Sequence, residues 1–121
     1  MSINQQDDDE GDLEFIDHEV DDAEAEHAAA AEHPRAFVVV NNSDNGDRVH
    51  FWIAFDVKVK RAIERAYKRL GVAREPGDRL TLRTDGSSVF PDEDLSVRKY
   101  ILKHGGKAKI RWTFAGDTGG A

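Results

Sequence analysis

Residues 59–71 decide the fold of this chain, and they read VKRAIERAYKRLG. The apolar residues recur every three or four positions, so they form one stripe along an α-helix. The stripe comprises Val59, Ala62, Ile63, Ala66, Tyr67 and Leu70. We expect Asp56 to cap the first turn and Gly71, in a left-handed conformation, to end the helix. A single helix with one apolar stripe needs another apolar surface to cover, which a sheet provides.

Five segments on either side of this helix have the composition of strands. They are residues 37–40, 48–53, 79–83, 88–90 and 107–114. The first is a β-branched run, most of the others alternate between apolar and polar residues, and Pro91 would stop the short fourth one. We expect turns at residues 41–47 and 104–106, with one or two helical turns around residues 95–102. The sequence therefore predicts an α+β domain, with a mixed four- to five-stranded sheet and one helix packed across it.

The alternation within the strands assigns side chains to the two faces of the sheet. One face and the helix stripe would form the core. Besides the stripe, the expected core residues are Val49, Phe51, Ile53, Leu80, Leu82, Tyr100, Ala108, Ile110 and Trp112. The other face would be open to solvent. It would also be basic, with Thr81, Arg83, Lys109, Arg111 and Thr113.

Charge divides the chain into two unlike parts. Residues 1–34 contain 13 of the 24 acidic residues and no Lys or Arg, whereas the remainder has a net charge of +6. The first part has too few large apolar residues to offset the entropy of ordering it. We therefore expect an acidic extension over residues 1–34, largely disordered or docking, although its Ala-rich part has good helix propensity. The domain would span residues 35–114, followed by a flexible tail over residues 115–121.

Composition excludes several functional classes. The chain has no cysteine, so disulfides, thiolate metal sites and a cysteine nucleophile are ruled out. No secretory signal or membrane-spanning stretch is visible, which predicts a cytoplasmic protein without a membrane partner. No nucleophile has an evident activating base, so we expect no catalytic residue and no cofactor. The most metal-like cluster lies in the acidic extension, where we expect no metal site; it comprises His18, Glu19, Glu26 and His27.

The order of the elements resembles ubiquitin and its relatives over residues 36–120. Local features also match; they are Asp56-Val57-Lys58-Val59 at the helix start, Gly71 at its end, Arg79-Leu80 at the third strand, and Asp94-Leu95-Ser96-Val97-Arg98-Lys99-Tyr100-Ile101 before the last strand. The resemblance implies a ubiquitin-like β-grasp fold. The lack of cysteine and the single residue after Gly119-Gly120 are similar to ubiquitin-like proteins of bacterial operons that also encode E1-, E2- and peptidase-like partners.

The resemblance also implies a function as a protein modifier that is not itself an enzyme. A peptidase would remove Ala121, and E1-like activating and E2-like conjugating enzymes would then attach the carboxylate of Gly120 to target proteins. Glycine has no Cβ, so Gly119 and Gly120 can pass through narrow enzyme grooves. If chains form through lysine, they must branch from the domain, whose candidate acceptors are Lys58, Lys60, Lys68, Lys99, Lys103, Lys107 and Lys109. The tail has Asp117 and no arginine, which departs from ubiquitin and implies a different E1. The basic sheet face is a second departure, because ubiquitin presents an apolar recognition patch there.

Two other functions remain open at this point. One is a sulfur carrier, a β-grasp protein that bears a thiocarboxylate on its terminal glycine. The other is a non-covalent, self-assembling interaction module that never conjugates. Nucleic-acid binding by the basic face is unlikely, because the acidic extension would compete for it.

Residues 12–17 form an apolar island in the acidic extension. They read DLEFID, so Leu13, Phe15 and Ile16 are flanked by acids. Such a segment is typical of peptides that add as a strand to a sheet edge, and opposite charge would steer it onto the basic domain. Docking within one molecule would mask the domain, whereas docking between molecules would give head-to-tail self-association. The alternative is an extension that only keeps the protein soluble.

Overall fold

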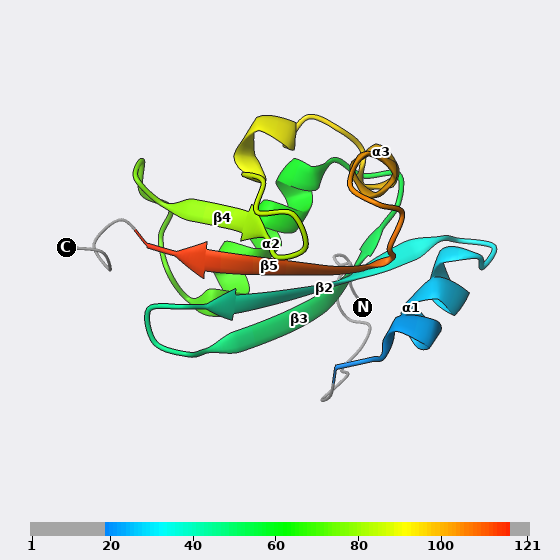
Figure 1. The fold of residues 1–121 in the computed structure, drawn as a ribbon, viewed down its shortest axis with the longest axis horizontal. Coiled ribbons are helices and arrows are strands. Elements are labelled where there is room, and N and C mark those ends of the chain that lie inside the picture. The colour runs from blue at the N-terminus through cyan, green and yellow to red at the C-terminus, as the bar shows by residue number, and fades with distance from the viewer. Residues whose placement is uncertain (1–18, 117–121) are drawn as a thin grey trace, which may run out of the picture.

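The structure is built on one mixed sheet of four strands in the order β3-β2-β5-β4 (Figure 1). This computed structural model describes residues 19–116. The strands are β2 (Arg35–Asn42), β3 (Arg48–Ala54), β4 (Arg79–Leu82) and β5 (Lys109–Ala115). Strand β2 pairs antiparallel with β3 and parallel with β5, and β5 pairs antiparallel with β4. The α+β class and the mixed sheet are therefore as predicted, with β2 and β5 at the centre.

Helix α2 (Val59–Leu70) packs its apolar stripe on one face of the sheet, as predicted. Gly71 ends it in a left-handed conformation with φ of 73°. The expected cap by Asp56 is wrong: Lys58 is the N-cap residue and its side chain makes no capping bond. Instead, the N–H groups of Val59 and Lys60 donate to backbone carbonyls of residues 95 and 93, each at 2.9 Å. The loop before the last helix thus satisfies these first donors, so no side-chain cap is needed.

The connection from β4 to β5 contains two short helical elements. These are the 3₁₀ turn η2 (Phe90–Asp92) and helix α3 (Val97–Lys103). The expected strand at residues 88–90 is therefore wrong, and Ser88 forms only an isolated bridge to Thr81. Pro91 lies in the first turn of η2, where a missing N–H costs nothing. The turn at residues 104–106 is confirmed, with positive φ at both glycines.

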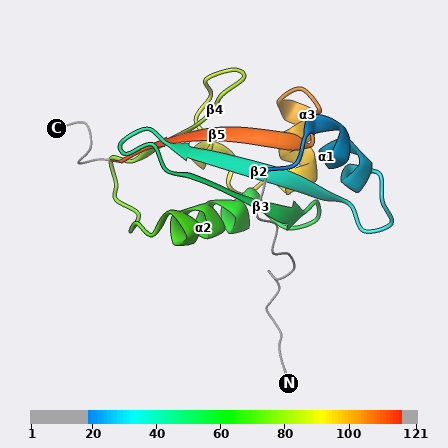
Figure 2. The same ribbon diagram turned by 90° about the horizontal axis from the view of Figure 1, so that it is seen from below.

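Strand β2 is buried on both of its faces. Val38 and Val40 face the main core beneath α2, whereas Phe37 and Val39 belong to a second cluster. Helix α1 (Asp22–Ala29) forms the other side of that cluster, and Figure 2 shows α1 and α2 on opposite sides of the sheet. The expectation of a fully solvent-exposed outer face is therefore wrong over β2 and the start of β5. No helix within residues 19–116 is long and apolar enough to cross a membrane.

Candidate functional site

The C-terminal strand leaves the sheet beside the turn between β2 and β3. The N–H of Gly116 donates to Asp44 Oδ2 at 2.8 Å, and Ser43 donates through its N–H and its Oγ to the carbonyl of Phe114. A Cβ on Gly116 would lie 3.0 Å from the same Asp44 oxygen, so glycine permits this close approach. The chain is thus held at the sheet up to Gly116. The predicted conjugation residues Gly119, Gly120 and Ala121 lie outside the described residues.

The candidate acceptor lysines are dispersed over the surface of the domain. Six of them are exposed: Lys58, Lys60, Lys68, Lys99, Lys103 and Lys107. Lys103 is also bonded to Asp92, with Nζ 2.6 Å from Oδ1. Lys109 differs from the others, because its residue is only 9% exposed and its Nζ lies 2.9 Å from Glu19 Oε2. A buried, ion-paired ammonium is a poor nucleophile, so Lys109 is the least accessible acceptor of the seven.

Residues 19–34, which we call the strap, lie across the outer face of the sheet. Glu19 accepts hydrogen bonds from Arg48 Nε and Nη2 at 2.7 and 2.8 Å, and it also pairs with Lys109. Asp22 accepts from Arg111 at 3.1 Å. Burial opposes ionisation of Glu19, but its hydrogen bonds and charge interactions with Lys109 and Arg48 outweigh this and lower its pKa. These ion pairs attach the first residues of the strap to the sheet.

The strap also satisfies a backbone group of the sheet. Glu26 Oε2 accepts a hydrogen bond of 2.7 Å from the N–H of Ala108, just before β5. Beneath it, Val20 and Ala25 pack against Phe37 and Val39. Glu19 and Glu26, considered above as metal ligands, are thus engaged by the sheet instead. Because Lys109 and Arg111 are paired, the basic outer face is largely neutralised; of that set, only Arg83 is exposed.

The sequence contained a signal for this covered face. Residues 36–40 form an uninterrupted apolar run, whereas a strand with one wet face alternates. Every residue of the run is buried. Burial of these residues on both faces of the sheet required a second layer over the outer face, but the run did not indicate which segment would form that layer. Ala25 and Ala28 were missed because a short Ala-rich helix has almost no apolar face of its own. Val20 was missed because it is a single apolar residue between Glu19 and Asp21.

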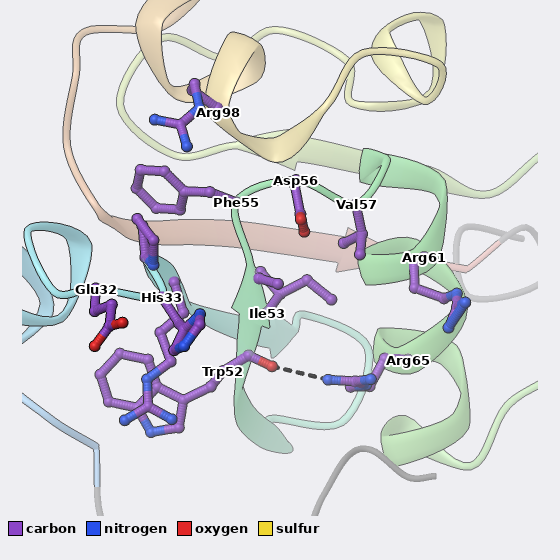
Figure 3. Close-up of a pocket in the computed structure, with 13 residues that line it drawn as sticks. Glu32, His33, Trp52, Ile53, Phe55, Asp56, Val57, Arg61, Arg65 and Arg98 are labelled. Atoms are coloured by element: carbon purple, nitrogen blue, oxygen red, sulfur yellow. Dashed lines mark hydrogen bonds between the residues drawn. The ribbon is translucent and has the colours of Figure 1, made fainter. Parts of the chain in front are cut away.

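A hollow of about 540 Å³ opens between the edge strand β3 and helix α2 (Figure 3). Four arginines line it, together with aromatic residues and two acids, Glu32 and Asp56. The arginines are Arg35, Arg61, Arg65 and Arg98. Arg35 lies over the ring of Trp52 at 4.5 Å, and Arg98 lies over Phe55 at 5.2 Å. The hollow therefore combines positive charge with apolar surface, which suits an acidic peptide with apolar side chains.

His104 forms a charge cluster at the end of α3. Its Nδ1 lies 2.9 Å from Asp85 Oδ2, and its Nε2 lies 2.9 Å from Asp92 Oδ2. Burial opposes the charged form, but hydrogen bonds and charge interactions with Asp92 and Asp85 outweigh it and raise the pKa of His104. Because both ring nitrogens contact carboxylates, neither is placed to act as a general base. The cluster ties α3 to η2 and to the turn after β4.

Raising the pH should weaken this cluster and destabilise the domain. The folded-state pKa of His104 lies above its ordinary value of 6.5, so protonation favours the fold. The contribution is present below 6.5 and is lost as the pH rises through the folded-state pKa. Urea unfolding midpoints across this range should fall in the wild type and change less in His104→Gln. His33→Gln, at an exposed residue, is the matched control. Equal pH dependence in all three proteins would contradict the assignment.

Comparison with known proteins supports the fold. No family model and no curated protein matches the chain. Among solved structures, it is similar to one described as "Molecular Mimicry of SUMO promotes DNA repair", with a TM-score of 0.52 and 15% identity over 70% of this chain and 95% of that one. It also matches the solution structure of SUMO from Trypanosoma brucei, with a TM-score of 0.47 and 19% identity over 90% and 93% of the chains. The first likeness and the strand order show a ubiquitin-like fold.

Proposed function

We propose that this chain is a ubiquitin-like modifier, attached to target proteins through the carboxylate of Gly120 after removal of Ala121. One observation carries the proposal. Strand β5 of a ubiquitin-like sheet ends at Ala115, and the sequence places a diglycine that begins three residues after Gly116, the last residue that the structure describes. From Ala115 to Gly120 the chain can span roughly 20 Å when extended. That length would let the carboxylate reach a buried active site while the domain stays outside it.

The chemistry would be supplied by partner proteins. An E1-like enzyme would activate the carboxylate, an E2-like enzyme would transfer it, and a peptidase would first cut between Gly120 and Ala121. The chain has no cysteine, as in the similar proteins of bacterial operons, and we extend the proposal to a bacterial system of this kind. Asp117 gives the tail a negative charge, so the E1-like partner should present a complementary positive groove.

Mass spectrometry of the protein from its native host tests this proposal. Trypsin cleaves after Lys and Arg, and the last such residue is Arg111, so a modified lysine would carry residues 112–120 as a branch. Such branches on other proteins support a modifier. Replacement of a terminal oxygen by sulfur would indicate a sulfur carrier instead. Intact Ala121 on all molecules would indicate a non-covalent module and would contradict conjugation.

The same measurement would locate the acceptors. Branches on lysines of this chain itself would show that chains form. We expect them on the six exposed lysines and not on Lys109, because Glu19 holds its ammonium group in the covered face. Conjugates that hydroxylamine releases would instead indicate ester linkages to Ser or Thr.

A further inference from the structure

The strap covers an apolar patch on the outer face of the sheet. Phe37 and Val39 lie in this patch and are 0% and 2% exposed. Trp52 extends it toward β3, with its ring edge-on to that of Phe37 and the two ring centres 4.9 Å apart. Basic side chains surround the patch as a rim, and they are Arg48, Lys109 and Arg111. An apolar centre within a polar rim is typical of surfaces that bind proteins.

The strap shows which kind of segment this surface accepts. Its acidic residues are spaced three and four positions apart, and they contact the rim or the backbone just before β5. Aliphatic residues between and beside them are buried. The acids are Glu19, Asp22 and Glu26, and the buried residues are Val20, Ala25 and Ala28. Spacings of three and four place residues on one side of a helix, so the surface fits the face of an acidic amphipathic helix.

The attachment of the strap allows it to be displaced. Residues 30–33, which link α1 to the sheet, are all exposed, and the carbonyl of Pro34 accepts a hydrogen bond of 3.0 Å from the N–H of Phe55. Helix α1 has eight residues, and a helix of that length is marginal in water by itself. Its buried side chains are alanines, each of which contributes little apolar area. A longer helix with the same pattern of residues could therefore take the place of the strap.

We propose that the outer face of the sheet binds an acidic amphipathic helix of a partner protein, and that the strap occupies this surface in the free chain. The basic rim selects an acidic partner and repels a basic one. The tether gives the strap an effective concentration on the order of 1 mM, so the partner must compete with it. The docking segment predicted at residues 12–17 lies outside the described residues and plays no part in this surface. The inference does not rest on conjugation.

A stapled copy of the strap serves as the probe for this surface. The probe is a fluorescent peptide of residues 19–33 with a hydrocarbon link between positions 23 and 27. Ala23 and His27 are both exposed, so the link leaves the contact residues intact. It also holds the peptide helical, which reduces the entropy cost of binding. The matched control peptide carries Ala25→Asp and therefore places a carboxylate against the patch.

The peptide should bind best to a full chain whose own strap is loosened. For the Ala25→Asp chain we expect a Kd below about 1 mM, the scale of concentration that the tether supplies. The wild-type chain should bind at least about tenfold more weakly, because its strap occupies the surface. Glu19→Arg loosens the strap by removing its pairs with Arg48 and Lys109, and it leaves the apolar patch unchanged. This second variant should have an intermediate affinity, and amide signals of α2 check that both variants are folded.

Charge reversals on the chain locate the surface. In the Ala25→Asp chain, adding Arg111→Glu should weaken peptide binding several-fold, because Arg111 pairs with Asp22 of the strap. Lys68→Glu makes a similar change at an exposed residue of α2, on the opposite side of the sheet (Figure 2), and should leave binding unchanged. Bound peptide should shift the amide signals of Phe37 and Val39.

Three results would overturn the proposal. The first is no binding to either loosened chain at millimolar peptide, which would make the strap a fixed part of the fold. The second is equal affinity for the wild-type and loosened chains, which would place the binding site elsewhere. The third is equal binding of the stapled peptide and its Ala25→Asp control. These titrations use only the chain and the peptide, so they fail or succeed independently of the proposed function.

Discussion

Replacing Gly120 with alanine should block conjugation while leaving the unfolding transition of the domain unchanged. Under the proposed function, the terminal glycines thread a narrow enzyme groove, and an added Cβ would displace the reacting carboxylate. A misplacement of about 1 Å can cost about a hundredfold in rate, so we expect a loss of at least that size. The last contact of the tail within residues 19–116 is that of Gly116 with Asp44, and we expect the free energy of unfolding to be the same in Gly120→Ala as in the wild type. Purified activating and conjugating partners would measure the transfer.

The second diglycine of the chain is the matched control. Gly105 and Gly106 lie in the turn before β5, with φ of 108° and 81°. Alanine at Gly106 should therefore cost about 1 kcal/mol of stability, yet leave transfer intact. Deleting Ala121 should bypass the peptidase. If the full-length chain with Ala121 in place is activated as well as the shortened one, the processing step is wrong.

Introducing a charge beneath the strap should detach it and destabilise the domain. Ala25 is fully buried against Phe37 and Val39, so Ala25→Asp must either bury an unpaired carboxylate or release α1. We expect a loss of about 2–3 kcal/mol in the free energy of unfolding, the usual cost of an unpaired buried polar group. Ala23→Asp makes the same change at an exposed position of the same helix and should change the free energy of unfolding very little. Urea unfolding of the two variants gives the comparison.

Truncation provides an independent measurement of the same contact. Removing residues 1–34 should expose Phe37 and Val39 and lower stability by about 3 kcal/mol, since a buried phenylalanine alone contributes about 1.5–3 kcal/mol. Removing residues 1–11 should leave stability unchanged. The truncated domain should also associate or precipitate more readily, because an apolar patch with a basic rim is then exposed. Equal stability of both truncated chains would show that the strap contributes nothing.

Local patterns in the sequence were enough to predict much of the fold. Helix α2 carries its own stripe and its own terminating glycine, so neither depends on distant residues. The alternation in β3 and β5 correctly places Phe51, Ile53, Ile110 and Trp112 in the core. These predictions are correct because the periodicity of apolar residues is set by neighbouring positions, and the side that it makes apolar is the side that becomes buried.

The sequence-based predictions are wrong where a segment distant in sequence makes a contact that was expected of a neighbouring residue. The cap predicted from Asp56 is replaced by carbonyls of residues 93 and 95. The strand expected at residues 88–90 is replaced by a turn, because Val89 enters the core and is completely buried. No local sequence pattern indicates either of these two differences, because each depends on which distant segments the fold brings together.

The sequence by itself determined the β-grasp order of elements, the charge division and the diglycine, because each is written in contiguous residues. Only the tertiary structure decided how the acidic extension meets the sheet. Ion pairs from Glu19 to Arg48 and Lys109 join residues 29 and 90 positions apart, and no spacing rule connects such residues. The structure likewise decided that Lys109 is covered and that β3 is an edge strand of the sheet within residues 19–116, with Arg65 and Arg69 of α2 bonded to its carbonyls. These properties depend on which surfaces of the helices and strands pack together in the folded chain, and no local sequence pattern indicates that packing.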